Sequence, residues 1–300
     1  MTTDRLSERS IKVDQHEHSI LEAGEGSLVV CLHGFPDNNE TFQHQVGPLV
    51  DAGYRIVCPM LPGLTSGVQH PSGRTSPVFA CDAIISLIEN LLHEAQQEKC
   101  HLVGHDWGAA VTYLIAGKRP DLCKSLATIC IPYNVSLLRT LLRCPSYIMN
   151  AWYITFFQIW WIAEYFVRRN DFGFIDMLYR TWCPPWRDYD DRLASVKKTL
   201  REAGALRGAL GYYRNSLFGL NSTSFQFRSM FRSNIEVPTL ALRGEYDECI
   251  PDVAWEQISV RRFRKEVSLN IIRDASHFPH LENPEAVNGQ LIRWLDEQEE

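Results

Sequence analysis

Short apolar runs alternate with longer amphipathic segments through the first part of the chain. The runs are continuous in apolar residues, which is typical of strands buried on both faces of a sheet. In the segments between them, apolar residues recur at helical spacing. This alternation predicts an α/β fold in which helices cover both faces of a mostly parallel sheet. We expect an opening strand or hairpin at 9–23, strands at 27–32, 54–58, 100–103 and 125–131, and helices at 41–52, 78–98 and 108–118.

The alternation stops after residue 132 and resumes at residue 237. The intervening segment contains no run with the pattern of a strand, and it is rich in aromatic residues, arginines and helical runs. We therefore expect an α/β core formed by 1–132 and 237–300, with a helical cap domain inserted at 133–236. The second part of the core is expected to hold strands at 237–242 and 267–272 and a helix at 284–297.

The most hydrophobic stretch of the chain, 147–167, lies inside this insertion. It approaches the length of a membrane span, but Gln158 and Glu164 interrupt it and its aromatic bulk is unusual for a lipid-facing helix. The pattern favours a cap helix that faces a pocket, with attachment to a membrane surface as the alternative. We expect the tryptophans of this region to pack the cap or to line an apolar pocket: Trp152, Trp160, Trp161, Trp182 and Trp186.

Composition narrows the class of protein further. Hydrophobic residues make up 45% and charged residues 22%, as in ordinary globular proteins, and the formal charge of −6 argues against nucleic acid or an anionic membrane as a partner. Residues 1–13 lack the apolar segment of a signal peptide. The nine cysteines include no C-x-x-C pair, so we expect a reducing, cytoplasmic location and neither a metal nor a cofactor.

The chemistry centres on Gly104-His-Asp106-Trp-Gly108, which follows a predicted strand and precedes a predicted helix. This spacing is that of a nucleophile elbow, whose glycines let strand and helix approach closely and whose central residue is held above the end of the sheet. A carboxylate in that place predicts a covalent alkyl ester as the intermediate. The alternative is a plain turn, since glycine and aspartate are both turn formers.

Along the chain, a nucleophile on such an elbow is followed by the acid and then by the histidine. Asp247 comes just after a predicted strand, and His277 comes after the last one. Because the carboxyl ends of parallel strands share one edge, we expect both to lie near Asp106. Glu245, Glu248 and Asp252 remain alternatives to Asp247, which could also be a capping carboxylate. His280 is the reserve base, and His33 and His105 are expected to be structural.

Four segments of the sequence are similar to motifs of one known family. They read His-Gly-Phe-Pro at 33–36, Gly-His-Asp-Trp-Gly at 104–108, Gly-x-x-Asp-x-x-x-Pro at 244–251 and Ser-His-Phe-x-x-x-Glu-Asn-Pro-Glu at 276–285. Together they resemble the α/β-hydrolase family, specifically its epoxide hydrolase and haloalkane dehalogenase branch. The resemblance spans nearly the whole chain and implies the α/β-hydrolase fold with an inserted cap.

The same resemblance implies roles for tyrosines of the cap. The segment 152–158 is similar to the W-Y-x-x-F-x-Q piece that carries one ring-opening tyrosine of epoxide hydrolases, here Tyr153. The segment 210–215 is similar to their L-N-W-Y-R-N piece, which points to Tyr213. Gly211 and Tyr212 depart from that pattern, so Tyr212 stays open as the second acid.

The activity implied is the conversion of an apolar epoxide and water to a vicinal diol. Asp106 attacks a ring carbon, the tyrosine hydroxyls protonate the opening oxygen, and His277, oriented by Asp247, activates water against the ester. Backbone N–H groups of Phe35 and Trp107 are expected to form the oxyanion hole. Phe35, Trp107 and Phe278 are the expected substrate contacts.

Two other functions fit parts of the pattern. A haloalkane dehalogenase shares the nucleophile and base but needs two N–H donors for the halide, and Trp107 supplies one. The second often comes from an asparagine where this chain has Phe35, which counts against this activity, although a tryptophan of the cap could substitute. A catalytically inert binding protein is the other alternative, and the complete triad argues against it.

Overall fold

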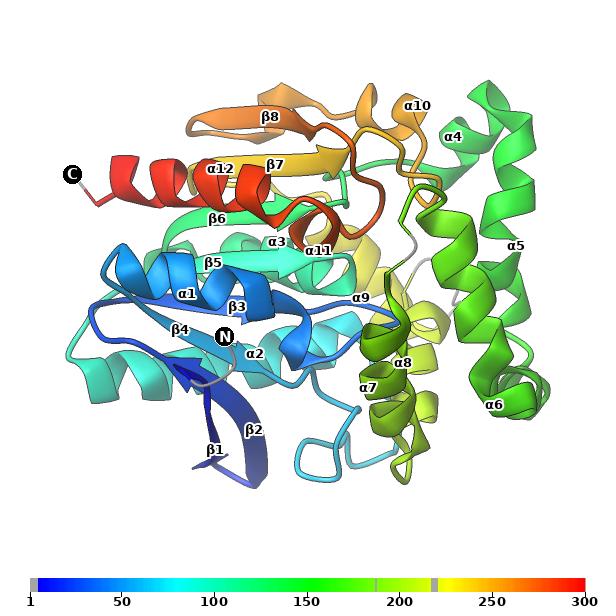
Figure 1. Cartoon of the computed structure of the whole chain (residues 1–300), viewed down its shortest axis with the longest axis horizontal. Coiled ribbons are helices and arrows are strands. Elements are labelled where there is room, and N and C mark those ends of the chain that lie inside the picture. The colour runs from blue at the N-terminus through cyan, green and yellow to red at the C-terminus, as the bar shows by residue number, and fades with distance from the viewer. Residues whose placement is uncertain (1–4, 187, 217–220, 300) are drawn as a thin grey trace.

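A computed structural model describes residues 5–186, 188–216 and 221–299. Its centre is an eight-stranded sheet in the order β1-β2-β4-β3-β5-β6-β7-β8 (Figure 1). The strands are β1 (Ser7–Val13), β2 (His16–Ala23), β3 (Ser27–Leu32), β4 (Tyr54–Pro59), β5 (Cys100–His105), β6 (Cys123–Ile129), β7 (Thr239–Gly244) and β8 (Val267–Ile272).

The pairing confirms the hairpin and the mostly parallel sheet that the sequence predicts. Strands β1 and β2 form an antiparallel hairpin, β2 is antiparallel to β4, and every other neighbouring pair is parallel. Strand β6 begins and ends two residues before the predicted range of 125–131. The alternation along β3 shows why the sheet is buried on both sides: Val30 and Leu32 belong to one apolar core, whereas Val29 and Cys31 belong to the other.

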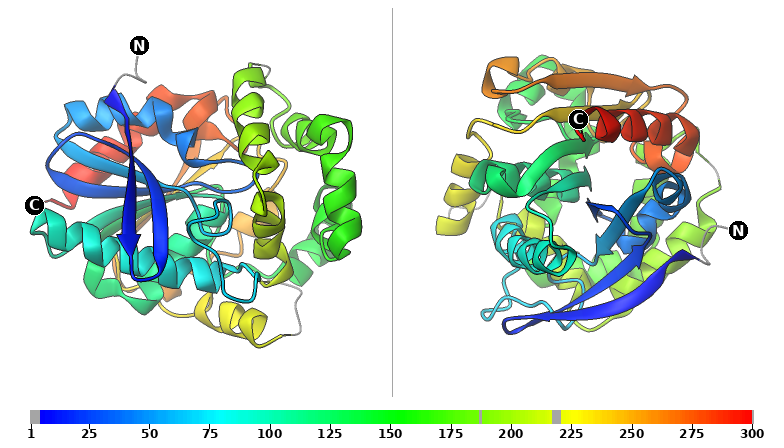
Figure 2. Two further views of the ribbon diagram at one scale, coloured as in Figure 1. Left: turned by 90° about the horizontal axis from the view of Figure 1, so that it is seen from below. Right: turned by 90° about the vertical axis from the view of Figure 1, so that its left-hand side faces the viewer.

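Helices cover both faces of this sheet (Figure 2). The pair α2 (Pro77–Ala95) and α3 (Trp107–Lys118) packs on one face. The pair α1 (Gln43–Asp51) and α12 (Pro284–Glu297) packs on the other. The layered α/β-hydrolase fold expected from the sequence is therefore confirmed.

The chain between β6 and β7 is helical in its described part, as predicted. These helices gather at the end of the molecule toward which the parallel strands point (Figure 1), except that α9 packs against α2 and α3 of the core. They are α4 (Leu137–Arg143), α5 (Ile148–Phe156), α6 (Trp160–Trp182), α7 (Asp190–Arg201), α8 (Ala205–Arg214) and α9 (Ser222–Met230). Two short helices, α10 (Asp252–Trp255) and α11 (Pro279–Glu282), follow in the core.

The hydrophobic stretch at 147–167 is divided between helices. Helix α5 ends at Phe156 and α6 begins at Trp160, with Ile159 outside helical geometry between them. Within α6 the backbone leaves the right-handed helix again at 169–172. Among the described residues, no helix combines the length and the apolar character needed to cross a bilayer.

Of the tryptophans expected to pack the cap or to line an apolar pocket, Trp161 departs most clearly from the expectation, because its side chain is mainly exposed. Trp182 is fully buried, but Trp152, Trp160 and Trp161 are 42%, 54% and 75% exposed. Helices α5 and α6 carry apolar side chains both on the side that faces the rest of the protein and on the side that faces solvent. Only the first of these sides is covered. Helical spacing identifies such apolar positions, but it does not say which side of the helix another element covers.

Two glycines give a matched test of how closely the helices must approach the sheet. A Cβ atom at Gly108 would lie 2.0 Å from the Leu32 carbonyl oxygen, whereas one at Gly289 in α12 meets no atom within 4 Å. Gly108→Ala should lower the free energy of unfolding by about 3 kcal/mol, because strand and helix must separate. Gly289→Ala should raise it by about 0.5–1 kcal/mol through better helix propensity. Urea denaturation of both variants measures these changes, and equal stability of the two variants would contradict the close-approach argument.

Candidate active site

Asp106 occupies a strained turn between β5 and α3. Its φ of 49° and ψ of −120° are unfavourable for a residue with a side chain. The turn is tightened by glycines, since a Cβ atom at Gly104 would lie 2.6 Å from the carbonyl oxygen of Gly108. One at Gly34, in the loop after β3, would lie 2.4 Å from Asp106 Cβ. This backbone therefore depends on small residues around it, and it holds the Asp106 side chain over the end of the sheet.

The two oxygens of the Asp106 carboxylate have different neighbours. The backbone N–H of Phe35 donates a hydrogen bond of 2.7 Å to Oδ1. Oδ2 faces the ring of His277, with 3.7 Å to Nε2. The side chain is almost completely buried, so these two contacts act on a carboxylate that little water reaches.

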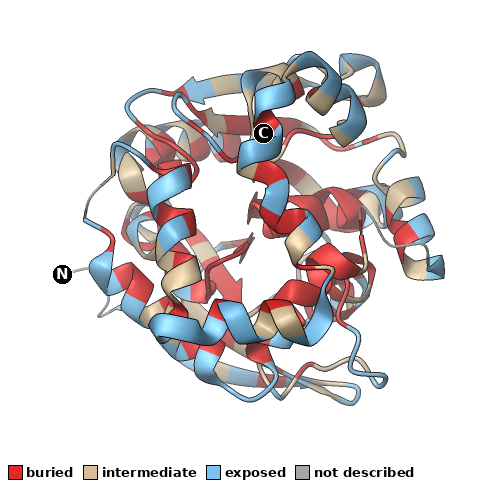
Figure 3. Ribbon diagram, turned by 90° about the vertical axis from the view of Figure 1, so that its right-hand side faces the viewer, coloured by how far each residue is buried: buried red, intermediate tan, exposed pale blue. Residues whose placement is uncertain are grey.

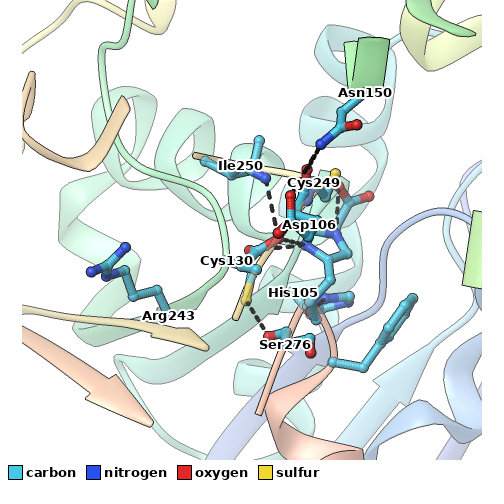
Figure 4. Close-up of polar contacts among 12 residues, drawn as sticks. His105, Asp106, Cys130, Asn150, Arg243, Cys249, Ile250 and Ser276 are labelled. Carbon is cyan, nitrogen blue, oxygen red and sulfur yellow. Dashed lines mark hydrogen bonds and ion pairs between the residues drawn. The ribbon is translucent and has the colours of Figure 1, made fainter. Parts of the chain in front are cut away.

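His277 is held by Asp247 from the opposite side of its ring. Its Nδ1 lies 3.1 Å from each carboxylate oxygen of Asp247. Asp247 Oδ1 is itself fixed by the backbone N–H groups of Cys249 and Ile250, at 2.9 and 3.1 Å. Figure 4 labels Cys249 and Ile250 on the same side of the site as Asp106. With Nδ1 committed to Asp247, Nε2 is left facing Asp106, and it has no hydrogen-bond partner among the described residues. The structure thus brings Asp106, His277 and Asp247 together.

The alternative acids lie elsewhere. Glu245 accepts a hydrogen bond from the backbone of Asp274, and Glu248 accepts one from Asn150. Asp252 forms an ion pair with Arg243. Each of these carboxylates has another partner, so Asp247 is the one that contacts His277.

The remaining histidines of the region brace the loops. His33 Nε2 accepts a hydrogen bond from the backbone N–H of Leu61 at 2.9 Å. His105 Nε2 bonds the His277 carbonyl oxygen at 2.8 Å, and His280 Nε2 lies 2.7 Å from the hydroxyl of Thr41. All three are buried, and burial lowers the pKa of each. They are placed to act as neutral structural groups.

The pKa of His277 is shifted in the other direction. Burial opposes its charged form, but the influence of Cys249 and Asp247, the nearby Asp106 carboxylate and the hydrogen bond with Asp247 together outweigh burial. The pKa of His277 is therefore well above its usual value. An imidazolium between two carboxylates follows from this arrangement.

Asp106 opens onto a cavity between the core and the cap. The cavity encloses about 820 Å³, part of it open to solvent, and its walls are mainly apolar. This is the size and character of a pocket for a small organic molecule. Besides Asp106, the walls are formed by Trp107, Ala110, Ile131, Pro132, Val135, Leu137, Thr140, Tyr147, Tyr153, Ile154, Tyr213, Phe227, Phe231, Cys249, Ile250 and Ala254.

Tyr153 and Tyr213 line this cavity together, whereas Tyr212 does not. Their rings lie 5.8 Å apart, and the Tyr153 hydroxyl lies 3.7 Å from the sulfur of Cys249. The hydroxyl of Tyr212 instead donates to the Pro62 carbonyl oxygen at 3.0 Å. Burial raises the pKa of Tyr153 and of Tyr213 well above the usual value, and for Tyr213 the Asp106 charge adds to this shift. Both tyrosines are therefore neutral hydrogen-bond donors.

The three predicted substrate contacts are placed differently. Trp107 lines the cavity. The ring of Phe35 packs edge-on against Tyr213 at 5.3 Å, behind the cavity wall. Phe278 is fully buried and stacks on Tyr179, with 4.8 Å between ring centroids. Phe278 therefore has no access to the cavity and is corrected to a packing residue.

Two groups of side chains have the composition of a metal site. Their ligand atoms lie within 4.8 Å of one another in His105, Cys130 and His277, and in Asp247, Cys249 and His277. Both groups use His277, so a bound cation would compete with the contact between His277 and Asp247. The geometry favours an acid–base role for His277.

Sequence reasoning missed several residues that shape the site. Cys249 lies between Asp247 and the cavity, and the Tyr147 hydroxyl donates to its carbonyl oxygen at 2.7 Å. A buried ion pair, Arg192 Nε to Asp37 Oδ1 at 3.0 Å, ties the cap to the loop after β3. The proximity of Cys249 to Asp247 in the sequence was a usable signal. The ion pair joins residues far apart along the chain, so no local sequence pattern indicates it.

Comparisons with known proteins agree with this architecture. The model of the alpha/beta hydrolase fold family matches residues 27–284. The AB hydrolase superfamily protein YfhM of Bacillus subtilis (strain 168) is 29% identical over 275 residues, which are 91% of this chain and 92% of that protein. Epoxide hydrolase 4 of Homo sapiens is 27% identical over 279 residues, covering 90% of this chain and 73% of that protein.

Solved structures give the same result for the fold. Epoxide hydrolase VrEH1 from Vigna radiata superposes with a TM-score of 0.81, at 21% identity over 99% of both chains. An epoxide hydrolase from an endophytic Streptomyces also reaches 0.81, at 21% identity over 97% of this chain and 95% of that one. These likenesses extend through the cap as well as the core.

The charge of Asp106 should control the pKa of His277. Asp106→Asn removes that charge with little change in size, and we expect it to lower the pKa of His277 by about 1 or more. Asp252→Asn, which removes an exposed carboxylate elsewhere, should leave this pKa unchanged. A pH titration of the imidazole resonances by NMR measures both variants. A His277 pKa equal to that of the unsubstituted protein in Asp106→Asn would refute the coupling.

Proposed function

Because the chain belongs to the alpha/beta hydrolase fold family, we propose that it is an epoxide hydrolase, which converts an apolar epoxide and water to a vicinal diol. The observation that carries the proposal is the pair of tyrosines, Tyr153 and Tyr213, that lines one apolar cavity with Asp106. The names of its relatives, among them Epoxide hydrolase 4 of Homo sapiens, support the same substrate class.

In the first step Asp106 attacks a carbon of the epoxide ring. Oδ2 forms the new C–O bond, because the Phe35 N–H occupies Oδ1 at 2.7 Å. The C–O bond of the ring breaks, and its electron pair goes to the epoxide oxygen. The product is an alkyl ester of Asp106 that carries an alkoxide on the neighbouring carbon.

The two tyrosines serve that oxygen. Each donates a hydrogen bond, and one transfers its proton as the ring opens. Their raised pKa values keep both hydroxyls protonated before the reaction, and an alkoxide is a far stronger base than a tyrosinate. The leaving oxygen remains attached to the substrate, so a pair of neutral proton donors suits it better than a halide site.

In the second step His277 removes a proton from water that attacks the ester carbonyl. Oδ1 becomes the oxyanion, and the Phe35 N–H that already contacts it would stabilise the charge together with the Trp107 N–H at the start of α3. Collapse of this intermediate breaks the bond between the carboxyl carbon and Oδ2. The leaving oxygen takes the proton of the newly formed Asp106 carboxylic acid, which releases the diol with the original Oδ2 and restores the carboxylate. The new oxygen of the Asp106 carboxylate comes from water.

The coupling of charges gives the two steps their order. While Asp106 is ionised, its charge close to Nε2 helps to keep the pKa of His277 high, so His277 is protonated and Asp106 is the nucleophile. Esterification removes the negative charge, which lowers the pKa of His277. The imidazolium then gives its proton, through solvent, to the tyrosinate left by ring opening, and Nε2 becomes free to accept a proton. His277 therefore becomes a base at the stage that requires one.

The cap and the location of the protein complete the proposal. We assign residues 133–236 to a cap domain that closes an apolar cavity over the core of 1–132 and 237–300, so that an apolar epoxide of moderate size is preferred. All nine cysteines are free, which supports a reducing, cytoplasmic location. No cofactor or metal takes part in the proposed steps.

Trapping the ester tests the proposal directly. In His277→Gln the second step should stop while the first proceeds, so intact-protein mass spectrometry after mixing with styrene oxide should show the mass of one added substrate. The double variant Asp106→Ala, His277→Gln should gain no mass, and His44→Gln, which changes an exposed histidine, should turn over without accumulating ester. Halide release from a haloalkane with no reaction of the epoxide would favour a dehalogenase, and no reaction with either would favour a binding protein.

The tyrosines can be tested separately from the nucleophile. The double variant Tyr153→Phe, Tyr213→Phe should slow ester formation by about 100-fold or more, because the opening oxygen loses its proton donors. Tyr212→Phe should form the ester at nearly the normal rate, since that hydroxyl contacts Pro62. Rapid-quench mass spectrometry of the Asp106 peptide in a His277→Gln background provides the rates. A larger effect of Tyr212→Phe than of Tyr213→Phe would transfer the role to Tyr212.

A further inference from the structure

The outer side of the cap exposes an unusual number of large apolar side chains. They lie on α4, on α5, at the junction before α6 and on α6, and each is between 42% and 75% exposed. Apolar patches of this extent on a protein surface mark interaction sites. We call this set the outer cap face: Leu138, Leu142, Ile148, Met149, Trp152, Ile159, Trp160, Trp161, Tyr165 and Phe166.

Part of the outer cap face is a continuous aromatic groove between α5 and α6. The ring of Trp152 lies 5.6 Å from that of Phe156, which in turn lies 6.3 Å from that of Phe166. These residues line an open groove of about 830 Å³ whose other walls include Arg169. The Arg169 guanidinium lies 5.8 Å from the Tyr165 ring centroid. An arginine at the edge of an aromatic groove suits a ligand that is anionic at one end and apolar at the other.

The charge of this region is opposite in sign to that of the whole chain. Residues 137–182 contain five arginines and three acidic residues, although the formal charge of the protein is −6. The three acids are engaged in ion pairs with residues of other helices: Glu164 with Arg207 and Arg214, Asp171 with Lys197 and Arg201, and Asp176 with Lys197.

The arginines of the outer side are less engaged. Among residues 5–186, 188–216 and 221–299, no carboxylate lies within ion-pair distance of Arg139, Arg168 or Arg169. Their charge is therefore available to an external anion. The net charge that argued against an anionic membrane does not describe this side of the protein.

The position of the outer cap face allows it to meet a flat surface. Helices α5 and α6 form the end of the molecule opposite the C-terminus in two perpendicular views (Figures 1 and 2). Viewed from that end, exposed residues run along the helices nearest the viewer, whereas the strands in the middle of the sheet behind them are buried (Figure 3). The inner sides of α4 and α5 supply Leu137 and Ile154 to the cavity, so the outer cap face is one helix away from it.

We propose that the outer cap face docks onto the surface of an anionic lipid bilayer. Trp160, Trp161 and Tyr165 would lie at the level of the headgroups, where such rings concentrate in membrane proteins. Arg168 and Arg169 would contact lipid phosphates. A second copy of the chain fits less well, because a two-fold contact through this face would place the same unpaired arginines opposite each other. Docking does not depend on the proposed reaction.

Sedimentation of the full chain with sucrose-loaded vesicles tests this inference. The protein should pellet with vesicles of phosphatidylcholine and phosphatidylglycerol in a 7:3 ratio, and much less with phosphatidylcholine alone. Arg168→Gln with Arg169→Gln should weaken binding to the anionic vesicles by roughly 5-fold for each arginine. Met149→Ser with Trp161→Ser, which removes two large exposed side chains from α5 and α6, should also weaken it.

Matched controls change other exposed residues, away from the cap. Arg264→Gln with Lys265→Gln removes two exposed charges, and Leu269→Ser with Ile271→Ser removes two exposed apolar side chains from β8. Both pairs should bind as the unsubstituted protein does, and thermal melting confirms that each variant is folded.

Three results would overturn the inference. The first is no pelleting with anionic vesicles, and the second is binding that neither pair of cap substitutions weakens. The third is a dimer in sedimentation velocity that Met149→Ser with Trp161→Ser dissociates, which would assign the face to a second copy of the chain. None of these outcomes bears on ester formation, which is measured without lipid.

Discussion

The site depends on a buried carboxylate held between two groups from distant parts of the chain. Asp106 receives the Phe35 N–H on one oxygen and faces His277 with the other. Both contacts require that β3, β5 and β8 are parallel strands of one sheet. The carboxyl ends of parallel strands lie at the same edge, so the loops that follow these strands meet there. The small residues at the elbow serve the same end, since they let loop, strand and helix approach until these atoms meet. The layered fold, the pairing of the strands and the glycines at the elbow are therefore all needed to place the Asp106 carboxylate between Phe35 and His277.

Burial makes that geometry chemically useful. In a site that excludes most water, the charges of Asp106, Asp247 and His277 act on one another strongly. The raised pKa of His277 expresses this coupling, and it implies that changing the charge of Asp106 changes what His277 can do. The cap contributes to the same effect, because it excludes solvent and supplies neutral tyrosines to the cavity. Its buried ion pair between Arg192 and Asp37 fastens it to the loop that carries Phe35.

Much of this was accessible from sequence because the constraints are local. The glycines around Asp106 and the positions of Asp247 and His277 just after strands identify the elbow and the edge of the sheet, and buried strands are visible as apolar runs. The exposure of Trp161 was not accessible, since an apolar helix position does not reveal whether another element covers it. Nor was the burial of Phe278 against Tyr179, because stacking between segments far apart in the chain depends on how the cap is placed. The reactive groups could therefore be predicted from the sequence better than the packing of the side chains that surround the cavity.

The central claim is that the protein, and not water, supplies the oxygen that first reaches the substrate. A single turnover of styrene oxide in 18O-water, with enzyme in excess, tests it most directly. We expect a diol that lacks the label, together with 18O in the carboxylate of the peptide that contains Asp106. A diol that carries 18O from the first turnover, with an unlabelled Asp106 peptide, would mean that water attacks the epoxide directly and would contradict the account.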